Sequence, residues 1–487
     1  MKQSNEIQQI SIALSAEKGG PVRATDLSLE QLQEQLATFR RALTNKNEGL
    51  LPEYIRDRLS PFNICVSHQF ADRVKQLHES LDKAIIDIID RWFDDTKADF
   101  PARMPLEKHE EDLLRWMNGP GREAVPKFAD KYGMWRSDYL IERNQEELES
   151  AKVCEINARF PYNGFWPIGL HERGSRTVAG EQCKYKFPND FELTKKVIFD
   201  SFNSTKPLFH ICEKWKGPDQ DPLLCEWKRR TGQEAIKIKP SELRLEDDTL
   251  KYCAEPQVNE AQTETNGGNG GPRPIEQCSL ELFQDEYAQL DPAVLQKIAT
   301  CCVSDLRTVF ITHDKRLLGI IEQELPDLVE RGVLTADERQ ALENGIAHTI
   351  LAGSNEMQQI LKLSKSDEKL RGKYIVKAVR DGFGTGIQMG KGLSQEEWLK
   401  LLESQAVKAL LPSEGTVVVQ KLVDHVWYDI VRHDGDDAGQ PKLLHLIGSY
   451  HMINGKLGVY GPWRVGEELH VGLRGPGDLV SSTIIRQ

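Results

Sequence analysis

An apolar segment that contains a single lysine runs directly into a glycine-rich turn, and few folds accommodate this combination. The segment reads VKAVRDGFGTGIQMGKG over residues 376–392. It is not a P-loop, because Thr385 stands in place of the first glycine of that motif and Gly392 in place of its hydroxyl residue. The dinucleotide-binding and protein-kinase patterns place their third glycine where this chain has Ile387. A lysine strand that enters a glycine hairpin therefore needs another explanation.

Lys377 lies inside the apolar run YIVKAV, which is predicted to be a β-strand. A buried ammonium group without a partner is costly, so Lys377 must reach an acceptor or an anionic ligand. The glycines that follow let the backbone approach such a ligand and offer N–H groups to its oxygens. The alternative is a plain hairpin turn whose lysine extends its charged end to water.

Two further predicted strands carry alternating polar side chains. WRSDYLIE contains Arg136 and Asp138, and KVCEIN contains Glu155 and Asn157. Residues i and i+2 of a strand share a face, so a hairpin of these strands would gather two carboxylates and one amide on one surface. Such oxygens suit Mg²⁺, which takes one or two protein carboxylates and completes its shell with water and phosphate oxygens. The alternative is an edge hairpin whose polar residues face water.

A second candidate lysine, Lys315, ends the segment TVFITHDK, which is predicted to be a strand. The alternative for Lys315 is a solvent-facing lysine at the start of a helix. Together, the two lysines, the glycine turn and the oxygen ligands describe a site for ATP and Mg²⁺.

Three short motifs resemble those of ATP-grasp ligases. EINARF resembles the Glu-x-Asn-x-Arg metal signature, VKAVRDGFGTG the lysine strand with its phosphate-covering loop, and VVVQKLV the adenine hinge. In most of these enzymes the metal motif comes last, whereas here it comes first. This order is similar to the circularly permuted arrangement of glutathionylspermidine synthetase and its relatives. That family continues its metal strand with Asn-Ala-Asp, whereas this chain has Asn157-Ala158-Arg159. The departure argues against glutathione and spermidine as substrates and does not affect the expected nucleotide site.

The resemblance implies a ligase that activates a carboxylate as an acyl phosphate and lets an amine displace the phosphate to form an amide. The implied Mg²⁺ ligands are Asp138, Glu155 and Asn157, and the implied catalytic residues are Arg136 and Arg159. The implied ATP-binding residues are Lys315, Lys377, Asp381, Gly382, Phe383, Gly384, Thr385, Gly386, Gln420, Lys421, Leu422, Val423 and Arg464, with Arg474 as another candidate arginine. In the hinge, the carbonyl of Gln420 and the amide of Leu422 would meet the adenine edge.

Two other classes of function could use the same residues. One is a phosphotransferase that phosphorylates an alcohol, and the other is a catalytically silent nucleotide-binding protein. The presence of both metal carboxylates and both lysines weighs against the silent protein. The expected substrates are a small carboxylate and an amine, with amino acids or short peptides favoured.

Composition narrows the class of protein further. The 487-residue chain has a net charge of −12, which argues against a nucleic-acid binder, since such proteins usually carry a basic face. No apolar run approaches the length of a membrane span, so we expect a cytoplasmic protein. The nine cysteines form no CxxC pair, and we expect them to be reduced thiols. The oligomeric state cannot be predicted from the sequence.

The order of apolar patterns predicts a mixed α/β chain of the α+β class, with an ATP-grasp fold in the permuted order. We expect a helical N-terminal region at 1–125, with helices at 28–48 and 71–95, and metal-binding strands at 126–205. A substrate-side α/β unit is expected at 206–305 with a flexible loop at 256–274, and the lysine, glycine-turn and hinge part at 306–487. The aromatic stretch 160–174 is either core or the lining of a substrate site.

Overall fold

The computed structural model describes the chain over twelve ranges, which are 6–43, 51–144, 146–160, 162, 164–181, 183–214, 217–254, 271–382, 384–433, 439–467, 478–480 and 482–484. Helices and strands are interspersed along these ranges and form several sheets. The predicted α+β class is confirmed. No helix within the described ranges is both long and apolar enough to cross a membrane.

The central sheet draws its strands from two distant parts of the chain. Its seven strands run in the order β19-β18-β16-β3-β4, with β15 and β17 also paired to β16, and every pairing is antiparallel. The strands are β3 (Met134–Arg143), β4 (Glu149–Asn157), β15 (Trp427–Val431), β16 (Pro441–Ile453), β17 (Leu457–Tyr460), β18 (Trp463–Gly466) and β19 (Asp478–Val480). The predicted strands WRSDYLIE and KVCEIN are therefore β3 and β4, and they adjoin a strand from the C-terminal part.

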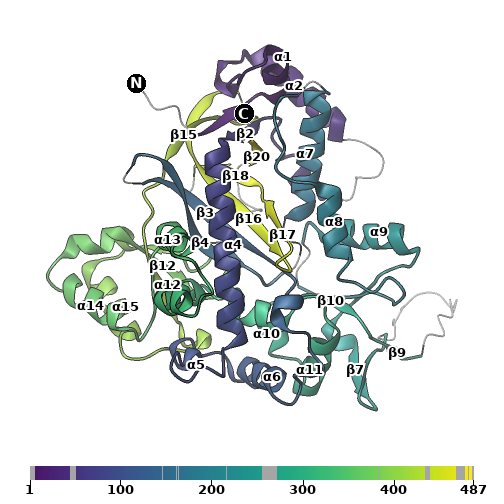
Figure 1. The fold of residues 1–487 in the computed structure, drawn as a ribbon, viewed down its shortest axis with the longest axis vertical. Coiled ribbons are helices and arrows are strands. Elements are labelled where there is room, and N and C mark those ends of the chain that lie inside the picture. The colour runs from purple at the N-terminus through teal and green to yellow at the C-terminus, as the bar shows by residue number, and fades with distance from the viewer. Residues whose placement is uncertain are drawn as a thin grey trace, which may run out of the picture.

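The long helix α4 (His68–Asp90) crosses one face of this sheet (Figure 1). Its His78 side chain hydrogen-bonds through Nε2 to Ser137 Oγ in β3 and stacks on Tyr450 of β16 at 4.4 Å between ring centroids. Asp82, one turn further along, accepts hydrogen bonds from Tyr132 and Trp135. Because Ser137 faces the helix, its neighbours Arg136 and Asp138 face the opposite side of the sheet.

A side unit of residues 349–421 stands apart from the central sheet and has its own core (Figure 1, green). Its four strands run in the order β11-β14-β12-β13, and the helices α14 and α15 pack on them around the buried Met357, Trp398 and Leu402. The elements are β11 (Thr349–Ile350), α14 (Asn355–Ser364), β12 (Tyr374–Ala378), β13 (Gln388–Met389), α15 (Gln395–Gln405) and β14 (Val417–Lys421). A capping box of Ser394 and Glu397 begins α15.

The predicted strand, helix, strand unit after residue 205 is present. β5 (Phe209–Cys212) pairs in parallel with β6 (Ile236–Ile238) and with β10 (Cys278–Glu281), and α9 (Gln220–Thr231) connects the first two. A small antiparallel sheet follows, with β7 (Leu243–Glu246), β8 (Thr249–Tyr252) and β9 (Arg273–Pro274). Most of the predicted loop 256–274 lies outside the described residues. After β10 the chain becomes helical at α10 (Gln284–Tyr287) and α11 (Pro292–Cys301).

The expectation of an all-helical N-terminal region is wrong. This region contains α1 (Ile12–Lys18), α2 (Leu29–Leu43), α3 (Glu53–Arg56), α4, α5 (Phe100–Arg103) and α6 (Lys108–Asn118), but also β1 (Ile7–Ile10) and β2 (Asn63–Val66). β2 pairs with β1 and, in parallel, with the C-terminal β20 (Ser482–Ile484). At four residues each, these two segments are too short to show a helical or strand period of their own, so their partners decide their structure.

The prediction of a strand at TVFITHDK is also wrong. Residues Thr308–Thr312 form a π-helical turn, closed by a 3.2 Å hydrogen bond from the N–H of His313 to the carbonyl of Thr308. The helices α12 (Arg316–Glu330) and α13 (Ala336–Gly345) follow. All five residues of the turn are buried. A short, fully buried apolar run is compatible with either structure, and here the packing selects the helical one. The remaining helices, α7 (Phe165–Ala179) and α8 (Phe191–Phe199), lie beside α4 in Figure 1.

Candidate active site

The hairpin of β3 and β4 gathers the four polar side chains on one face. Arg136 lies opposite Asn157, and Asp138 lies opposite Glu155. Asn157 Nδ2 is 3.0 Å from Asp138 Oδ2 and 3.2 Å from Glu155 Oε1. The side chains therefore form one connected polar group on the face of the sheet away from α4.

Two arginines hold Asp138. Arg136 Nε and Nη2 lie 2.9 Å and 3.0 Å from its two carboxylate oxygens, and Arg464 Nη2 from β18 lies 2.8 Å from Oδ2. Burial alone would raise the pKa of Asp138, but the two guanidinium groups outweigh it and bring that pKa below its ordinary value. The carboxylate of Glu155 is more accessible than that of Asp138, since the Glu155 side chain is 26% exposed. The other candidate arginine, Arg474, lies outside the described residues.

Lys315 and Lys377 converge on the same hairpin. Lys377 Nζ in β12 lies 3.3 Å from the carbonyl oxygen of Cys154, although the two residues are 223 positions apart. Lys315 Nζ lies 3.8 Å from Glu155 Oε2 and donates to the carbonyl of Asp381 at 2.6 Å. Burial lowers the pKa of Lys315, while Glu155 raises it and Lys377 lowers it further. Neither lysine is a solvent-facing residue, because each is only 5% exposed.

The glycine turn sits at the edge of this group. It joins β12 to β13, which pair in an antiparallel register with Val376 opposite Gln388. Gly384 and Gly386 adopt left-handed φ angles of 79° and 71°, so the turn uses conformations that L side chains rarely adopt. Asp381 and Thr385 are exposed, Gly382 is half-buried, and Phe383 lies outside the described residues. The turn thus places exposed backbone directly after the lysine strand.

Gly386→Ala is expected to raise the KM for ATP several-fold. A left-handed alanine costs about 1–2 kcal/mol, and its Cβ would lie 2.9 Å from Cβ of Ala378 in β12. The matched control is Gly392→Ala, outside the turn, since a Cβ there meets no atom within 4 Å and the φ angle is not left-handed. Initial rates of ADP release at varied ATP measure both variants. Equal KM values for the two variants would show that the left-handed conformation of the turn does not contribute to ATP binding.

The residues of the predicted hinge already have hydrogen-bond or packing partners within the protein. Gln420 is buried, and its Nε2 donates to the carbonyl of Cys154 at 3.2 Å and to Thr349 Oγ1 at 2.9 Å. The N–H of Lys421 donates to the carbonyl of His348, and the N–H of Leu422 donates to that of Lys373, each at 2.8 Å. An adenine contact from Leu422 would therefore have to replace its bond to Lys373. Val423 is buried and packs with Cys154 and Ala347.

A buried ion-pair network supports this group, and the sequence interpretation missed it. Arg380 pairs with Glu110 of α6 and, at 3.0 Å, with Asp314, which also binds Arg316. Arg159 donates through Nη2 to the carbonyl of Arg380. Burial, followed by the charge of Arg380, lowers the pKa of Arg159 to about 10. The only signal in the sequence was that charged residues adjoin two apolar segments, at Asp314 and at Arg380.

The aromatic stretch 160–174 is mainly core. Tyr162, Phe165 and Trp166 belong to a buried cluster, and residues from Phe165 onward form α7. The buried carboxylate of Asp219 accepts hydrogen bonds from the N–H groups of Gly164 and Trp166, each at 2.7 Å. The stretch thus contributes to the buried core at the start of a helix.

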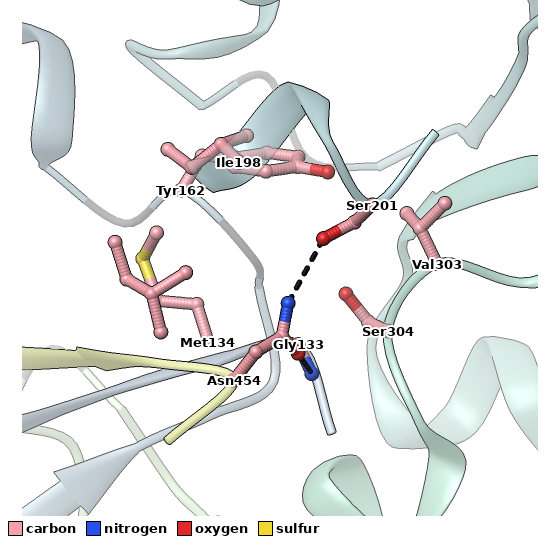
Figure 2. Close-up of a pocket in the computed structure, with 9 residues that line it drawn as sticks. Gly133, Met134, Tyr162, Ile198, Ser201, Val303, Ser304 and Asn454 are labelled. Atoms are coloured by element: carbon pink, nitrogen blue, oxygen red, sulfur yellow. Dashed lines mark hydrogen bonds between the residues drawn. The ribbon is translucent and has the colours of Figure 1, made fainter. Parts of the chain in front are cut away.

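A small cavity lies at the beginning of β3, and Figure 2 shows its lining. Its volume of about 20 Å³ holds about one water molecule. Asn454 bridges it, since its Oδ1 accepts from the N–H of Gly133 at 2.7 Å and its Nδ2 donates to Ser201 Oγ at 2.9 Å. The cavity is too small for a nucleotide, and the residues that line it include none of the predicted site residues.

Comparison with known proteins identifies the family. Over 483 residues the chain is 31% identical to a protein from Aspergillus thermomutatus described as ATP-grasp enzyme ankG, covering 94% of this chain and 96% of that protein. The chain belongs to the ATP-grasp family. Residues 77–311 of this ATP-grasp enzyme also match the model of the AnkG N-terminal domain. A glutathione synthetase-like effector from Globodera pallida, solved in the apo form, shares its fold with a TM-score of 0.53, 11% identity and coverage of 94% and 97% of the two chains.

The family relationship confirms the resemblance noted in the motifs. At a coarse level it supports an ATP-dependent ligase that acts on small molecules. The residues fit the nucleotide and metal that the family implies. Lys315 and Lys377 are buried cations that contact backbone carbonyls, and Glu155 with Asn157 offers the hard oxygen ligands that Mg²⁺ prefers.

Proposed function

We propose that this ATP-grasp enzyme joins a small carboxylate to an amine through an acyl phosphate. One observation carries the proposal, which is that two buried lysines meet the acidic hairpin at adjacent residues, Lys377 of β12 at the carbonyl of Cys154 and Lys315 at the carboxylate of Glu155. A lysine for phosphate and an acid for metal are thereby adjacent, as a triphosphate with its magnesium requires.

Glu155 and Asn157 would hold Mg²⁺, with Asp138 as a third ligand. The ion, when bound, neutralises negative charge on the phosphate oxygens. Asp138 would have to share its carboxylate between the ion and the arginines Arg136 and Arg464. Its role is therefore partly to fix those two guanidinium groups beside the reacting atoms.

The first step forms the acyl phosphate. A carboxylate oxygen of the acid substrate attacks the γ-phosphorus, the bond from that phosphorus to the β–γ bridging oxygen breaks, and ADP leaves. Lys315 and Lys377 bind phosphate oxygens and stabilise the charge that gathers on them. Both lysines are buried, so their charges act with little screening by water.

The second step forms the amide. The amine nitrogen attacks the acyl carbon, the carbon–oxygen bond to phosphate breaks, and the nitrogen loses a proton. Arg136 is proposed to donate hydrogen bonds to the oxyanion of the tetrahedral intermediate, and Arg159 to an oxygen of the acid or of the phosphoryl group. The turn at 381–387 would close over the phosphates and keep water from the acyl phosphate.

ADP release with amino acids supplied singly and in pairs tests the proposal. We expect release to require both a carboxylate and an amine, with a condensation product detected by mass spectrometry. ADP release with one hydroxylated compound and no amine would instead identify a phosphotransferase. Nucleotide binding without turnover would identify a silent protein.

A further inference from the structure

His313 is a buried histidine that the proposed function leaves without a role. It follows the π-helical turn and precedes Lys315 by two residues. Its side chain is only 5% exposed, and its Nδ1 accepts a hydrogen bond from the N–H of Ala158 at 3.3 Å. Its Nε2 has no hydrogen-bond partner within the described part of the chain. Buried polar atoms are nearly always paired, so this atom calls for an explanation.

The hydrogen of the imidazole lies on Nε2. Because Nδ1 accepts from Ala158, it carries a lone pair, and the neutral ring must then hold its proton on the other nitrogen. Burial lowers the pKa of His313 well below its usual value, and the charges of Arg159, Lys315 and Arg380 lower it further while Glu155 opposes them. The side chain is therefore a neutral donor in a cationic environment.

Arg159 presents a second unpaired donor in the same neighbourhood. Its Nη2 donates to the carbonyl of Arg380, while its Nε has no partner among the residues described. The guanidinium group lies over the rings of Phe160 and Phe283, at 5.8 Å and 5.2 Å from their centroids. Asp314, the buried acid next to His313 in the chain, is already paired with Arg316 and Arg380. The two unpaired donors, His313 Nε2 and Arg159 Nε, therefore lack acceptors within the described residues, and an anionic ligand would supply them.

The π-helical turn is what gives His313 its direction. The turn contains one residue more than a turn of α-helix, so the side chains that follow it are rotated by about 100° around the helix axis. Such π-helical turns are frequent at functional sites. The turn is fixed by the bond from the His313 N–H to the carbonyl of Thr308. It therefore lets the histidine and Lys315 serve the same site.

We propose that His313 Nε2–H, together with Arg159, binds oxygens of the terminal phosphoryl group of ATP during its transfer. The inference rests on the proposed function. His313 binds Ala158, which follows the proposed metal ligand Asn157, and it lies two residues before Lys315, which is proposed for phosphate. A ligand group held beside both is the phosphoryl end of the nucleotide and not its adenine end. His313 is then a substrate-binding residue that the family motifs did not identify.

The variants His313→Asn and His313→Gln separate binding from structure. The asparagine amide can replace Nδ1 and keep the bond to Ala158, but it offers no donor at the place of Nε2. The glutamine amide reaches the place of Nε2 but gives up the bond to Ala158. A phosphoryl-binding role predicts that the glutamine variant is the better of the two, whereas a purely structural role predicts the reverse.

Calorimetry measures how well each variant binds the terminal phosphoryl group, and it needs no acid substrate. ADP and Mg²⁺ are titrated with and without aluminium fluoride, which serves as the phosphoryl mimic. We expect the mimic to tighten ADP binding in the wild type and in His313→Gln, and the tightening to fall about tenfold or more in His313→Asn. Binding of ADP alone should be the same in all three, whereas the unfolding midpoint should fall in His313→Gln, which leaves the buried N–H of Ala158 without its acceptor. Equal tightening in all three, or a greater loss in His313→Gln, would overturn the role of His313 and leave the proposed function standing. Wild-type protein that bound no ADP would overturn both.

Discussion

Arg136→Ala is expected to lower the rate of ligation by about 10²–10³. The guanidinium group is buried beside the proposed metal ligands and donates to both oxygens of Asp138. Its loss removes a donor that, in the proposed mechanism, stabilises the oxyanion of amide formation. The fold should persist, because Arg464 still pairs with Asp138 at 2.8 Å.

Steady-state rates of product formation, with circular dichroism as the folding check, measure this effect. The matched control is Arg143→Ala, an exposed arginine at the far end of the same strand, which should keep wild-type turnover. Retention of more than about a tenth of wild-type turnover by Arg136→Ala would show that the residue is not a catalytic group.

Arg380→Met is expected to lower the free energy of unfolding by about 3–5 kcal/mol. The arginine is buried, and its removal leaves Glu110 without its guanidinium partner and takes one of two from Asp314. An uncompensated buried carboxylate is costly, whereas the methionine itself packs well.

Denaturant unfolding of the full chain measures this loss of stability. Arg339→Met is the control, since Arg339 pairs with Glu343 at 2.7 Å on the surface, with side chains 41% and 36% exposed. Such an exposed pair contributes at most about 1 kcal/mol. Similar losses in both variants would mean that the Arg380 network is not the support described here.

The hairpin and the lysine strand could be predicted because their patterns are local. Arg136 and Asp138 alternate with apolar residues, as do Glu155 and Asn157, and the short link between the strands favours their pairing. Lys377 within an apolar run implied a buried partner before any partner could be named. The partner is the carbonyl of Cys154.

The hinge and the position of Lys315 show where such patterns stop being informative. The family resemblance implies a contact between the N–H of Leu422 and adenine, and in the structure this N–H donates to the carbonyl of Lys373, because the end of β14 stays against β12. The segment Thr308–Thr312 before Lys315 is short and wholly buried, and nothing in it distinguishes a strand from a π-helical turn. The orientation of the His313 side chain depends on this difference, because the π-helical turn sets it.

Residue patterns alone predict the α+β class, the two strand pairs that carry the motifs, and the kinds of side chain available for phosphate and metal. The contacts between distant segments could be found only in the folded protein: β2 joins β20, Glu110 meets Arg380 across 270 positions, and His313 binds Ala158, the residue before Arg159. The two kinds of information differ in their range along the chain. Residue patterns report a segment's own period and its nearest neighbours, whereas these pairings depend on which distant surfaces bury one another.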